Sequence, residues 1–199
     1  MIGKDKRASI SHHILLTGFM GVGKSTVGRL LASLLNLKFS DLDQVIEAQV
    51  GSKVCEIFQT SGEAFFREKE SEVLCQLLRE DAQVIALGGG AFLNPENLKE
   101  IKPRGLTIYL KASIPTLCSR LNRQDPEQRP LLLSHEGLDQ KTQVQNLLRQ
   151  RESLYGLADF WVDTDEKQPE QVAHDILKLI SFVPQTQEES SGGEGGHCA

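Results

Sequence analysis

The stretch Gly18–Thr26 constrains this chain more than any other part of it. It reads GFMGVGKST and fits the phosphate-binding pattern G-x-x-x-x-G-K-[ST] without a gap. An apolar run at 13–17 precedes it, and residues 25–35 carry apolar side chains at helical spacing, as a strand–loop–helix unit requires. Glycines in such a loop let backbone N–H groups converge on phosphate oxygens, and the helix N-terminus adds positive potential. The sequence therefore predicts binding of a nucleoside triphosphate.

The loop also predicts how the nucleotide is held. Lys24 would bridge the β- and γ-phosphates, and the Ser25 hydroxyl would ligate Mg²⁺. The residues expected to contact the nucleotide are Gly21, Val22, Gly23, Lys24, Ser25 and Thr26. The alternative is a glycine-rich turn before a helix with Lys24 merely solvated, but motif and flanking elements agree on a phosphate site.

Short β-rich runs alternate with longer helical patterns along the rest of the chain. Strands are expected at 13–17, 37–41, 83–87, 106–110 and 160–162, and helices at 25–35, 44–50, 95–101, 115–122, 141–155 and 169–180. A capping box at Thr60–Glu63 predicts the start of a further helix. Strands alternating with helices predict βαβ crossovers and hence an α/β fold, a parallel sheet flanked by helices. A chain of 199 residues suits a single domain.

Three segments depart from this alternation. Residues 1–11 are expected to be a flexible N-terminus, and 185–199 a disordered acidic tail rich in glycine and serine, without bulky apolar residues. The polar, proline-containing stretch at 122–139 lacks periodicity and is typical of a lid. The folded domain is therefore expected to span residues 12–184.

Composition argues against several broad classes of protein. The net charge of −5 argues against general binding to nucleic acid or to an anionic membrane. No apolar run approaches the roughly 18 residues of a membrane span, and no signal-peptide core follows the basic N-terminus. The four cysteines are scattered, without metal-ligand spacing, as is typical of free thiols in a reducing compartment. We therefore expect a cytoplasmic protein.

Two large classes of nucleotide-binding protein lack their motifs here. A GTPase would need Asn-Lys-x-Asp and Asp-x-x-Gly, and neither string occurs. A motor ATPase would normally carry an acidic residue at the end of a further apolar strand, whereas the run at 83–87 is followed by Gly88-Gly89-Gly90. The carboxylate that helps to hold Mg²⁺ must therefore come from another part of the chain.

The pair Asp41-Leu42-Asp43 is the best candidate for that acid. At an extended strand end, residues two apart point the same way, so both carboxylates are expected to face one cleft. One could order the hydration shell of Mg²⁺, and the other could accept a proton from an attacking hydroxyl. The alternative is that Asp43 caps the helix at 44–50.

Three arginines add a second kind of ligand site. Arg67 and Arg151 lie on apolar helix faces, and Arg129 lies in the aperiodic loop. Alone, each would more often be a snorkelling side chain or half of a buried ion pair. Together with the Gly88–Gly90 turn, Arg67 and Arg151 indicate a small carboxylated alcohol as substrate, because guanidinium groups bind carboxylates bidentately. Arg129 over the γ-phosphate would stabilise the transferred charge.

In order and spacing, these motifs resemble the shikimate kinase family. The resemblance covers about Ile14 to Ile180 and rests on Gly18–Thr26, Asp41-x-Asp43, Phe66-Arg67, Gly88–Gly90, Arg129-Pro130-Leu131-Leu132 and Arg151 before Tyr155. It implies an adenylate-kinase-like P-loop fold with a five-stranded parallel sheet, a substrate-binding region at about 43–80 and a lid at about 122–139. It also implies ATP-dependent phosphorylation of the 3-hydroxyl of shikimate in chorismate and aromatic amino acid biosynthesis, with Mg²⁺ as cofactor. A monomer is expected.

The resemblance further implies roles for single residues. Asp43 is similar to the residue that holds the reacting hydroxyl, and Arg67 and Arg151 to the partners of the shikimate carboxylate. Residues similar to those lining that pocket are Gly89, Gly90, Phe58 and Phe66. On the nucleotide side, Ser25 and Asp41 resemble Mg²⁺-side residues, Lys24 and Arg129 resemble catalytic residues, and Arg120 resembles one that packs on adenine and, like Arg129, binds ATP.

Two other functions share part of this pattern. A gluconate- or nucleoside-type small-molecule kinase would have the same phosphate loop but gives no reason for the other motifs to occur together. A catalytically silent domain that binds nucleotide or a protein partner would not need candidates at every catalytic position.

Overall fold

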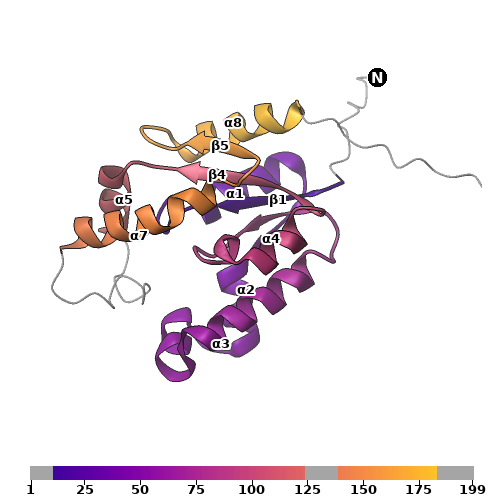
Figure 1. Cartoon of the computed structure of the whole chain (residues 1–199). Helices are drawn as coiled ribbons and strands as arrows, with labels where there is room; N and C mark the ends of the chain where they lie inside the picture. The colour runs from indigo at the N-terminus through magenta and orange to yellow at the C-terminus, as the bar shows by residue number, and fades with distance from the viewer. Residues whose placement is uncertain (1–10, 124–138, 183–199) are drawn as a thin grey trace, which may run out of the picture.

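The computed structural model describes residues 11–123 and 139–182 as five strands with helices on both sides (Figure 1). The elements follow in the order β1 (His13–Thr17), α1 (Lys24–Leu35), β2 (Lys38–Asp41), α2 (Leu42–Val50), α3 (Val54–Leu77), β3 (Gln83–Ala86), the 3-10 helix η1 (Ala91–Leu93), α4 (Pro95–Ile101), β4 (Gly105–Lys111), α5 (Ile114–Leu121), α7 (Gln140–Tyr155), β5 (Phe160–Asp163) and α8 (Pro169–Ser181). The strands and helices expected from periodicity are confirmed to within one or two residues at most ends.

The five strands form one sheet in the order β2-β3-β1-β4-β5, and all neighbours are parallel. Every residue of the central strand β1 is buried, because helices cover it on both faces. Its Leu16 pairs with Ala86 of β3 and with Ile108 of β4. The predicted α/β fold with a five-stranded parallel sheet is confirmed.

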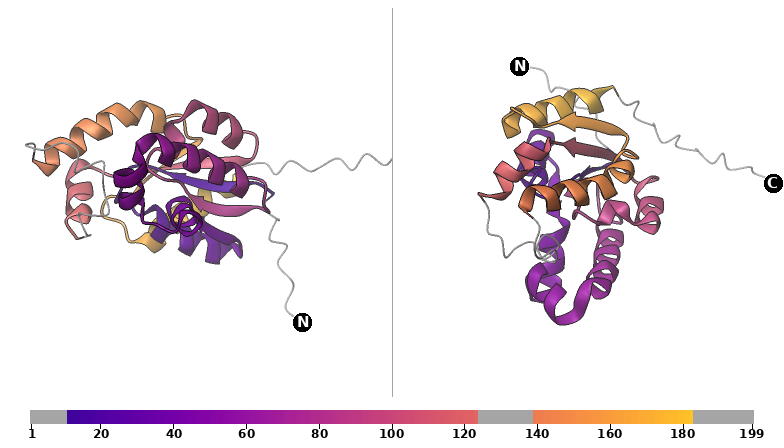
Figure 2. Two further views of the ribbon diagram at one scale, coloured as in Figure 1. Left: turned by 90° about the horizontal axis from the view of Figure 1, so that it is seen from below. Right: turned by 60° about the vertical axis from the view of Figure 1, so that its left-hand side comes forward.

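The helices form a layer on each side of this sheet. Helices α1 and α8 pack against each other on one face, and α4 and α7 lie on the other (Figures 1 and 2). Helices α2 and α3 pack together and project from the edge of the sheet that β2 forms (Figure 1). The core between the layers is continuous, with Ile14, Leu31, Ile85 and Ile108 essentially inaccessible to solvent. Burial of this apolar surface is the main stabilising contribution.

The helix start predicted at Thr60–Glu63 is confirmed, but the capping box assigned to it is wrong. Helix α3 begins at Val54, and the Thr60 hydroxyl donates to the Glu56 carbonyl one turn back, so it does not cap a new helix. The helix is instead interrupted at Gly62, whose φ of 80° and ψ of 171° suit glycine alone. A second helical run therefore starts after Gly62, inside α3 and joined to the run that begins at Val54.

The geometry expected for Asp41 and Asp43 is also wrong. Asp41 ends β2 and is the N-cap of α2, where its carboxylate accepts from the Gln44 backbone N–H. Asp43 lies in the first turn of α2 and not on the strand, so the alternation of a strand does not orient it, and it does not cap the helix.

Several expectations fall outside the described residues: the N-terminal segment 1–10, most of the loop at 122–139 with Arg129, and the tail at 185–199. Within residues 11–123 and 139–182, Cys55, Cys75 and Cys118 are free thiols, as expected. In the same ranges, no helix combines the length and apolar character needed to cross a membrane.

Candidate active site

The candidate site lies at the carboxyl ends of the strands. The phosphate loop follows β1, Asp41 ends β2, the turn Gly88–Gly90 follows β3, and Thr164 follows β5. In open parallel sheets, ligands bind in the crevice beyond these ends, and here the crevice straddles the central strand. The topology therefore gathers segments that are far apart in sequence.

The phosphate loop has the geometry of an anion cradle. Gly23 is the N-cap of α1 with a φ of 105°, and no atom lies within 4 Å of where its Cβ would stand. The Lys24 ammonium lies over the loop and donates to the carbonyls of Gly18 (2.9 Å) and Phe19 (3.2 Å). Burial lowers the pKa of Lys24 to about 8, although Asp43 and Asp41 oppose that change. An open helix N-terminus and a buried cation together suit a phosphate group.

Ser25 and Asp41, which the sequence predicts on the metal side, are hydrogen-bonded to each other. The Ser25 hydroxyl donates to Asp41 Oδ2 at 2.5 Å. Both line one cavity of about 280 Å³ with Lys24 and Asp43. A hydroxyl and a carboxylate are the oxygen donors that Mg²⁺ prefers, so the residues present fit that ion.

Asp43 is the most perturbed acid in this cavity. Its Oδ1 atom is buried and has no hydrogen-bond partner among the described residues. Burial, with help from the nearby carboxylates of Glu70 and Asp41, raises the pKa of Asp43 to about 7, although Lys24 and Arg67 oppose the rise. An unpaired acid that titrates near neutrality beside a phosphate loop is a candidate for contact with a reacting hydroxyl.

The turn Gly88–Gly90 explains how the charged groups come so close. A Cβ on Gly88 would lie 2.6 Å from a carboxylate oxygen of Asp43 and 2.6 Å from one of Glu70. A Cβ on Gly90 would overlap the Arg67 guanidinium, and one on Gly89 would lie 3.4 Å from Arg151 Nη1. Each glycine therefore makes room for at least one charged side chain.

Arg67 is held on α3 by two glutamates. Its Nη1 donates to the buried Glu70 at 2.8 Å, and its Nη2 donates to the exposed Glu63 at 3.0 Å. The guanidinium carbon also lies 5.3 Å from the centre of the Phe66 ring. Glu70 keeps one buried oxygen, Oε1, without a partner among the described residues.

Arg151 approaches the same turn from α7. It is 8% exposed, and its Nη1 donates to the Gly89 carbonyl at 3.2 Å. The Tyr155 hydroxyl, one helical turn further on, donates to the same carbonyl at 2.9 Å. The two arginines therefore reach the triglycine turn from different helices, as a clamp on a small anion requires.

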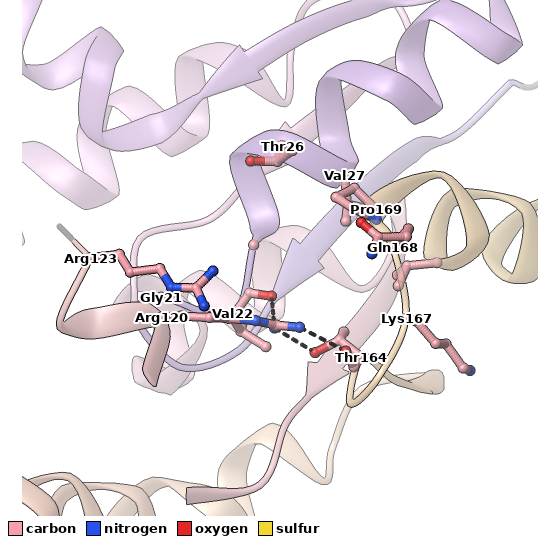
Figure 3. A pocket seen from close by; sticks show the side chains of 12 residues that line it. Gly21, Val22, Thr26, Val27, Arg120, Arg123, Thr164, Lys167, Gln168 and Pro169 are labelled. Atoms are coloured by element: carbon pink, nitrogen blue, oxygen red, sulfur yellow. Dashed lines mark hydrogen bonds between the residues drawn. The ribbon is translucent and has the colours of Figure 1, made fainter. Parts of the chain in front are cut away.

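A second cavity, of about 500 Å³, adjoins the outer side of the phosphate loop (Figure 3). Arg120 crosses it and is fixed by donating to the carbonyls of Val22 (3.0 Å) and Thr164 (2.7 Å) and to the Thr164 hydroxyl (2.9 Å). Arg123, Lys167 and Pro169 also line the cavity. The cations that line this cavity, and its position beside the phosphate loop, suit the part of a nucleotide that extends beyond the phosphates.

Comparison with known proteins decides the family. The family model described as shikimate kinase matches residues 20–181. The chain belongs to the shikimate kinase family. It is 42% identical to the shikimate kinase of Zymomonas mobilis over 84% of this chain and 92% of that protein. It is 41% identical to that of Thermus thermophilus over 84% of this chain and 89% of that protein.

Solved structures agree with this membership. Shikimate kinase from Acinetobacter baumannii, in complex with shikimate, is similar with a TM-score of 0.80 and 36% identity over 87% of this chain and 94% of that one. A gluconokinase from Sinorhizobium meliloti is similar with a TM-score of 0.54 but only 14% identity, over 86% of this chain and 97% of that one. The second likeness shows a shared fold alone.

The shikimate kinase resemblance named two phenylalanines as walls of the substrate site. Phe58 and Phe66 lie on either side of the Gly62 break, with ring centres 4.9 Å apart. Phe66 is buried and Phe58 only half-buried, so Phe58 is the more accessible of the two. Phe66 lies beneath Arg67 as part of the core.

Sequence reasoning missed three polar residues of this kinase site. Glu70 follows Arg67 by three positions, a spacing that usually indicates an exposed ion pair, and nothing in the sequence shows that it is buried. Thr164 follows directly after β5, and the end of a parallel strand is the signal that could have found it. Tyr155 belongs to a motif of the family resemblance, which implies no role for it.

Proposed function

We propose that this chain transfers the γ-phosphoryl group of ATP to the 3-hydroxyl of shikimate in the cleft around Gly88–Gly90. One observation carries the proposal: the triglycine turn brings Asp43, Arg67 and Arg151 together beside a phosphate loop. That combination offers a group for a hydroxyl, two cations for a carboxylate and a cradle for phosphates. Membership of the shikimate kinase family supports the same substrate and reaction.

The nucleotide binds across the two cavities that share Gly21, Gly23 and Thr26. Backbone N–H groups at the start of α1 receive the phosphates, and Lys24 moves from the loop carbonyls to the β- and γ-phosphates. The adenosine part lies in the cavity crossed by Arg120, whose fixed guanidinium offers a flat surface to a base.

Mg²⁺ would be held by Ser25 and, through water, by Asp41. When bound, the ion neutralises charge that develops on the phosphate oxygens. The existing hydrogen bond between the two side chains keeps both oxygens at the edge of the phosphate loop.

The shikimate carboxylate binds between Arg67 and Arg151. Arg151 donates from Nη1 to the Gly89 carbonyl and also interacts with the Tyr155 hydroxyl, which holds the guanidinium beside the turn before substrate binds. Arg67 is more strongly engaged, because Glu63 and Glu70 both accept from it. Glu70 therefore fixes the position of Arg67 on the side of the turn where the carboxylate binds.

Asp43 accepts a hydrogen bond from the 3-hydroxyl and directs the hydroxyl oxygen at the γ-phosphorus. The free Oδ1 atom is the acceptor available for that bond. Phosphoryl transfer with a loose transition state demands little of a base, so orientation is the larger part of this role. Arg129, which the family resemblance places over the γ-phosphate, lies outside the described residues.

We expect the enzyme to be a cytoplasmic monomer, as the family resemblance implies. Free thiols at Cys55, Cys75 and Cys118 suit the reducing cytoplasm.

The position of the transferred phosphate tests the proposal. Purified protein is incubated with ATP, MgCl₂ and shikimate, and the product is examined by phosphorus–proton correlation NMR. We expect a single product with phosphate on the 3-oxygen. Phosphate on another hydroxyl, or none on shikimate, would contradict the proposal.

A further inference from the structure

The Gly89 carbonyl accepts two hydrogen bonds from one helix. Arg151 Nη1 lies 3.2 Å from it, and the Tyr155 hydroxyl lies 2.9 Å from it. Arg151 and Tyr155 are four residues apart on α7, so they lie on the same face of that helix. The proposed site uses Arg151 but gives no task to Tyr155.

Tyr155 is placed with little freedom to move. It is fully buried and is the last residue of α7. Its ring stacks on Tyr109 of β4 with centres 5.1 Å apart and an interplanar angle of 22°. Because packing fixes the ring, its hydroxyl stays at the Gly89 carbonyl whatever Arg151 does.

The two donors on this carbonyl therefore differ in mobility. Arg151 has a long side chain beside the cleft, and presenting Nη1 together with Nη2 to a carboxylate draws Nη1 from the Gly89 carbonyl. The Gly89 carbonyl is part-buried, and leaving a carbonyl in such a place without a donor costs free energy. With Tyr155 still bonded, Gly89 retains a partner when Arg151 leaves.

We propose that Tyr155 is a positioning residue that holds the Gly88–Gly90 turn in place while Arg151 moves from the Gly89 carbonyl to the substrate carboxylate. Tyr155 does not touch the substrate and acts through Gly89 and Arg151. This inference rests on the proposed function, because it takes the carboxylate clamp as given. It extends that function to a residue outside the clamp.

Replacing Tyr155 by phenylalanine tests the inference, because Y155F keeps the ring and its stacking and removes only the hydroxyl. We expect KM for shikimate to rise about 5- to 30-fold, the factor that corresponds to one lost hydrogen bond at this part-buried carbonyl. We expect KM for ATP to change less than twofold, because the hydroxyl that Y155F removes bonds to Gly89 and, among the described residues, to no part of the phosphate loop. A merely structural role would affect both substrates.

Tyr109→Phe is the matched control. It removes a hydroxyl from the other ring of the stacked pair, and among the described residues no hydrogen bond joins the Tyr109 hydroxyl to the Gly88–Gly90 turn. We expect Y109F to retain the wild-type KM for shikimate. An equal KM in Y155F and Y109F would overturn the inference.

A double-mutant cycle separates this inference from the clamp itself. If Tyr155 acts through Arg151, Y155F should raise KM much less in an R151A background than in the wild type. If R151A alone leaves KM for shikimate unchanged, the clamp is wrong. If R151A raises KM and Y155F has the same effect with and without Arg151, only the role of Tyr155 is wrong.

Calorimetric titration keeps the test decisive if Y155F is less stable. Shikimate and ADP are titrated separately into each variant at 10 °C, after circular dichroism has shown the same helical content as the wild type. We expect weaker binding of shikimate and unchanged binding of ADP in Y155F. Equal weakening of both ligands would overturn the inference.

Discussion

Gly88 lies so close to Asp43 that a Cβ on the glycine would stand 2.6 Å from the Asp43 Oδ1 atom. The same Cβ would stand 2.6 Å from Glu70 Oε1. These two oxygens are buried and have no hydrogen-bond partner among the described residues. The glycine thus keeps open a small space onto which two carboxylates converge, and the proposed contact between Asp43 and the 3-hydroxyl depends on that space.

Gly88→Ala is therefore expected to disrupt the site without changing the fold. The added methyl group must displace Asp43 or Glu70, and a displacement of about 1 Å at reacting groups can cost on the order of 100-fold in rate. We expect kcat/KM for shikimate to fall by about that factor in steady-state assays. Gly89→Ala, where the nearest atom is 3.4 Å from the new Cβ, should have a smaller effect. Equal activities of the two variants would contradict this steric account.

Asp43→Asn is expected to reduce kcat by about 100-fold or more, because the amide is a weaker acceptor for the reacting hydroxyl. The affinity for ATP, measured by titration, should stay close to that of the wild type. In the wild type, kcat/KM for shikimate should rise with pH through about 7, as the Asp43 carboxylate forms. A near-normal kcat in this variant would show that Asp43 has no part in the reaction.

The same substitution should stabilise the protein at high pH. The pKa of Asp43 is raised by burial, from 3.8 to about 7, so the folded state binds this proton more tightly than the unfolded chain does. The free energy of unfolding therefore falls as pH rises from about 4 to 7, and the loss is complete above 7. We expect D43N to have a higher Tm than the wild type at pH 8 and no such advantage near pH 4. A lower Tm for D43N at pH 8 would contradict this sign.

Arg67→Ala should chiefly weaken the binding of shikimate. Loss of a charge-assisted bond to the carboxylate corresponds to roughly a 10- to 100-fold rise in KM. Lys69→Ala is a matched control on the same helix, because its ammonium pairs with the exposed Glu72 and not with the site. An R67A enzyme with an unchanged KM for shikimate would show that the carboxylate binds elsewhere.

His13 gives the fold a pH dependence of its own. Its Nε2 atom donates to the Leu78 carbonyl at 3.3 Å, while its buried Nδ1 atom has no partner among the described residues. Burial lowers the pKa of His13, and the carboxylate of Glu80 only partly opposes this. The unfolded state therefore binds the proton more tightly, and stability present above about pH 6.5 is lost as pH falls below it.

Urea titrations between pH 5.5 and 7.5 test this effect. As pH falls, the free energy of unfolding of His13→Gln should drop less than that of the wild type. His174→Gln, on the exposed side of α8, should show the same drop as the wild type. A decrease of the same size in the wild type and H13Q would assign it to other groups.

Much of the fold could be predicted because the sequence patterns that mark its strands and helices are local. The phosphate loop, the apolar strands and the helical spacing each lie within a short window, and the structure keeps those boundaries nearly unchanged. The start of a helical run near Gly62 has a local signal, but its continuity with the run that begins at Val54 does not. Whether Thr60 caps a new turn or bonds the previous one depends on packing.

The site was predicted less completely because it depends on tertiary contacts. Asp41 and Asp43 do line one cavity, but α2 begins directly after Asp41 and brings them there, not the alternation of a strand. Nothing local marks Glu70 as buried or shows that each glycine of Gly88–Gly90 faces a charged side chain. Those relations exist only once α3, α7 and the end of β3 are packed together.

Release of ADP in a coupled assay tests the central claim most directly. The purified protein is given ATP and MgCl₂ with either shikimate or gluconate, which is also a carboxylated alcohol. We predict ADP release that depends on both shikimate and Mg²⁺, and none above the buffer rate with gluconate. ADP release with gluconate but not with shikimate would contradict the account.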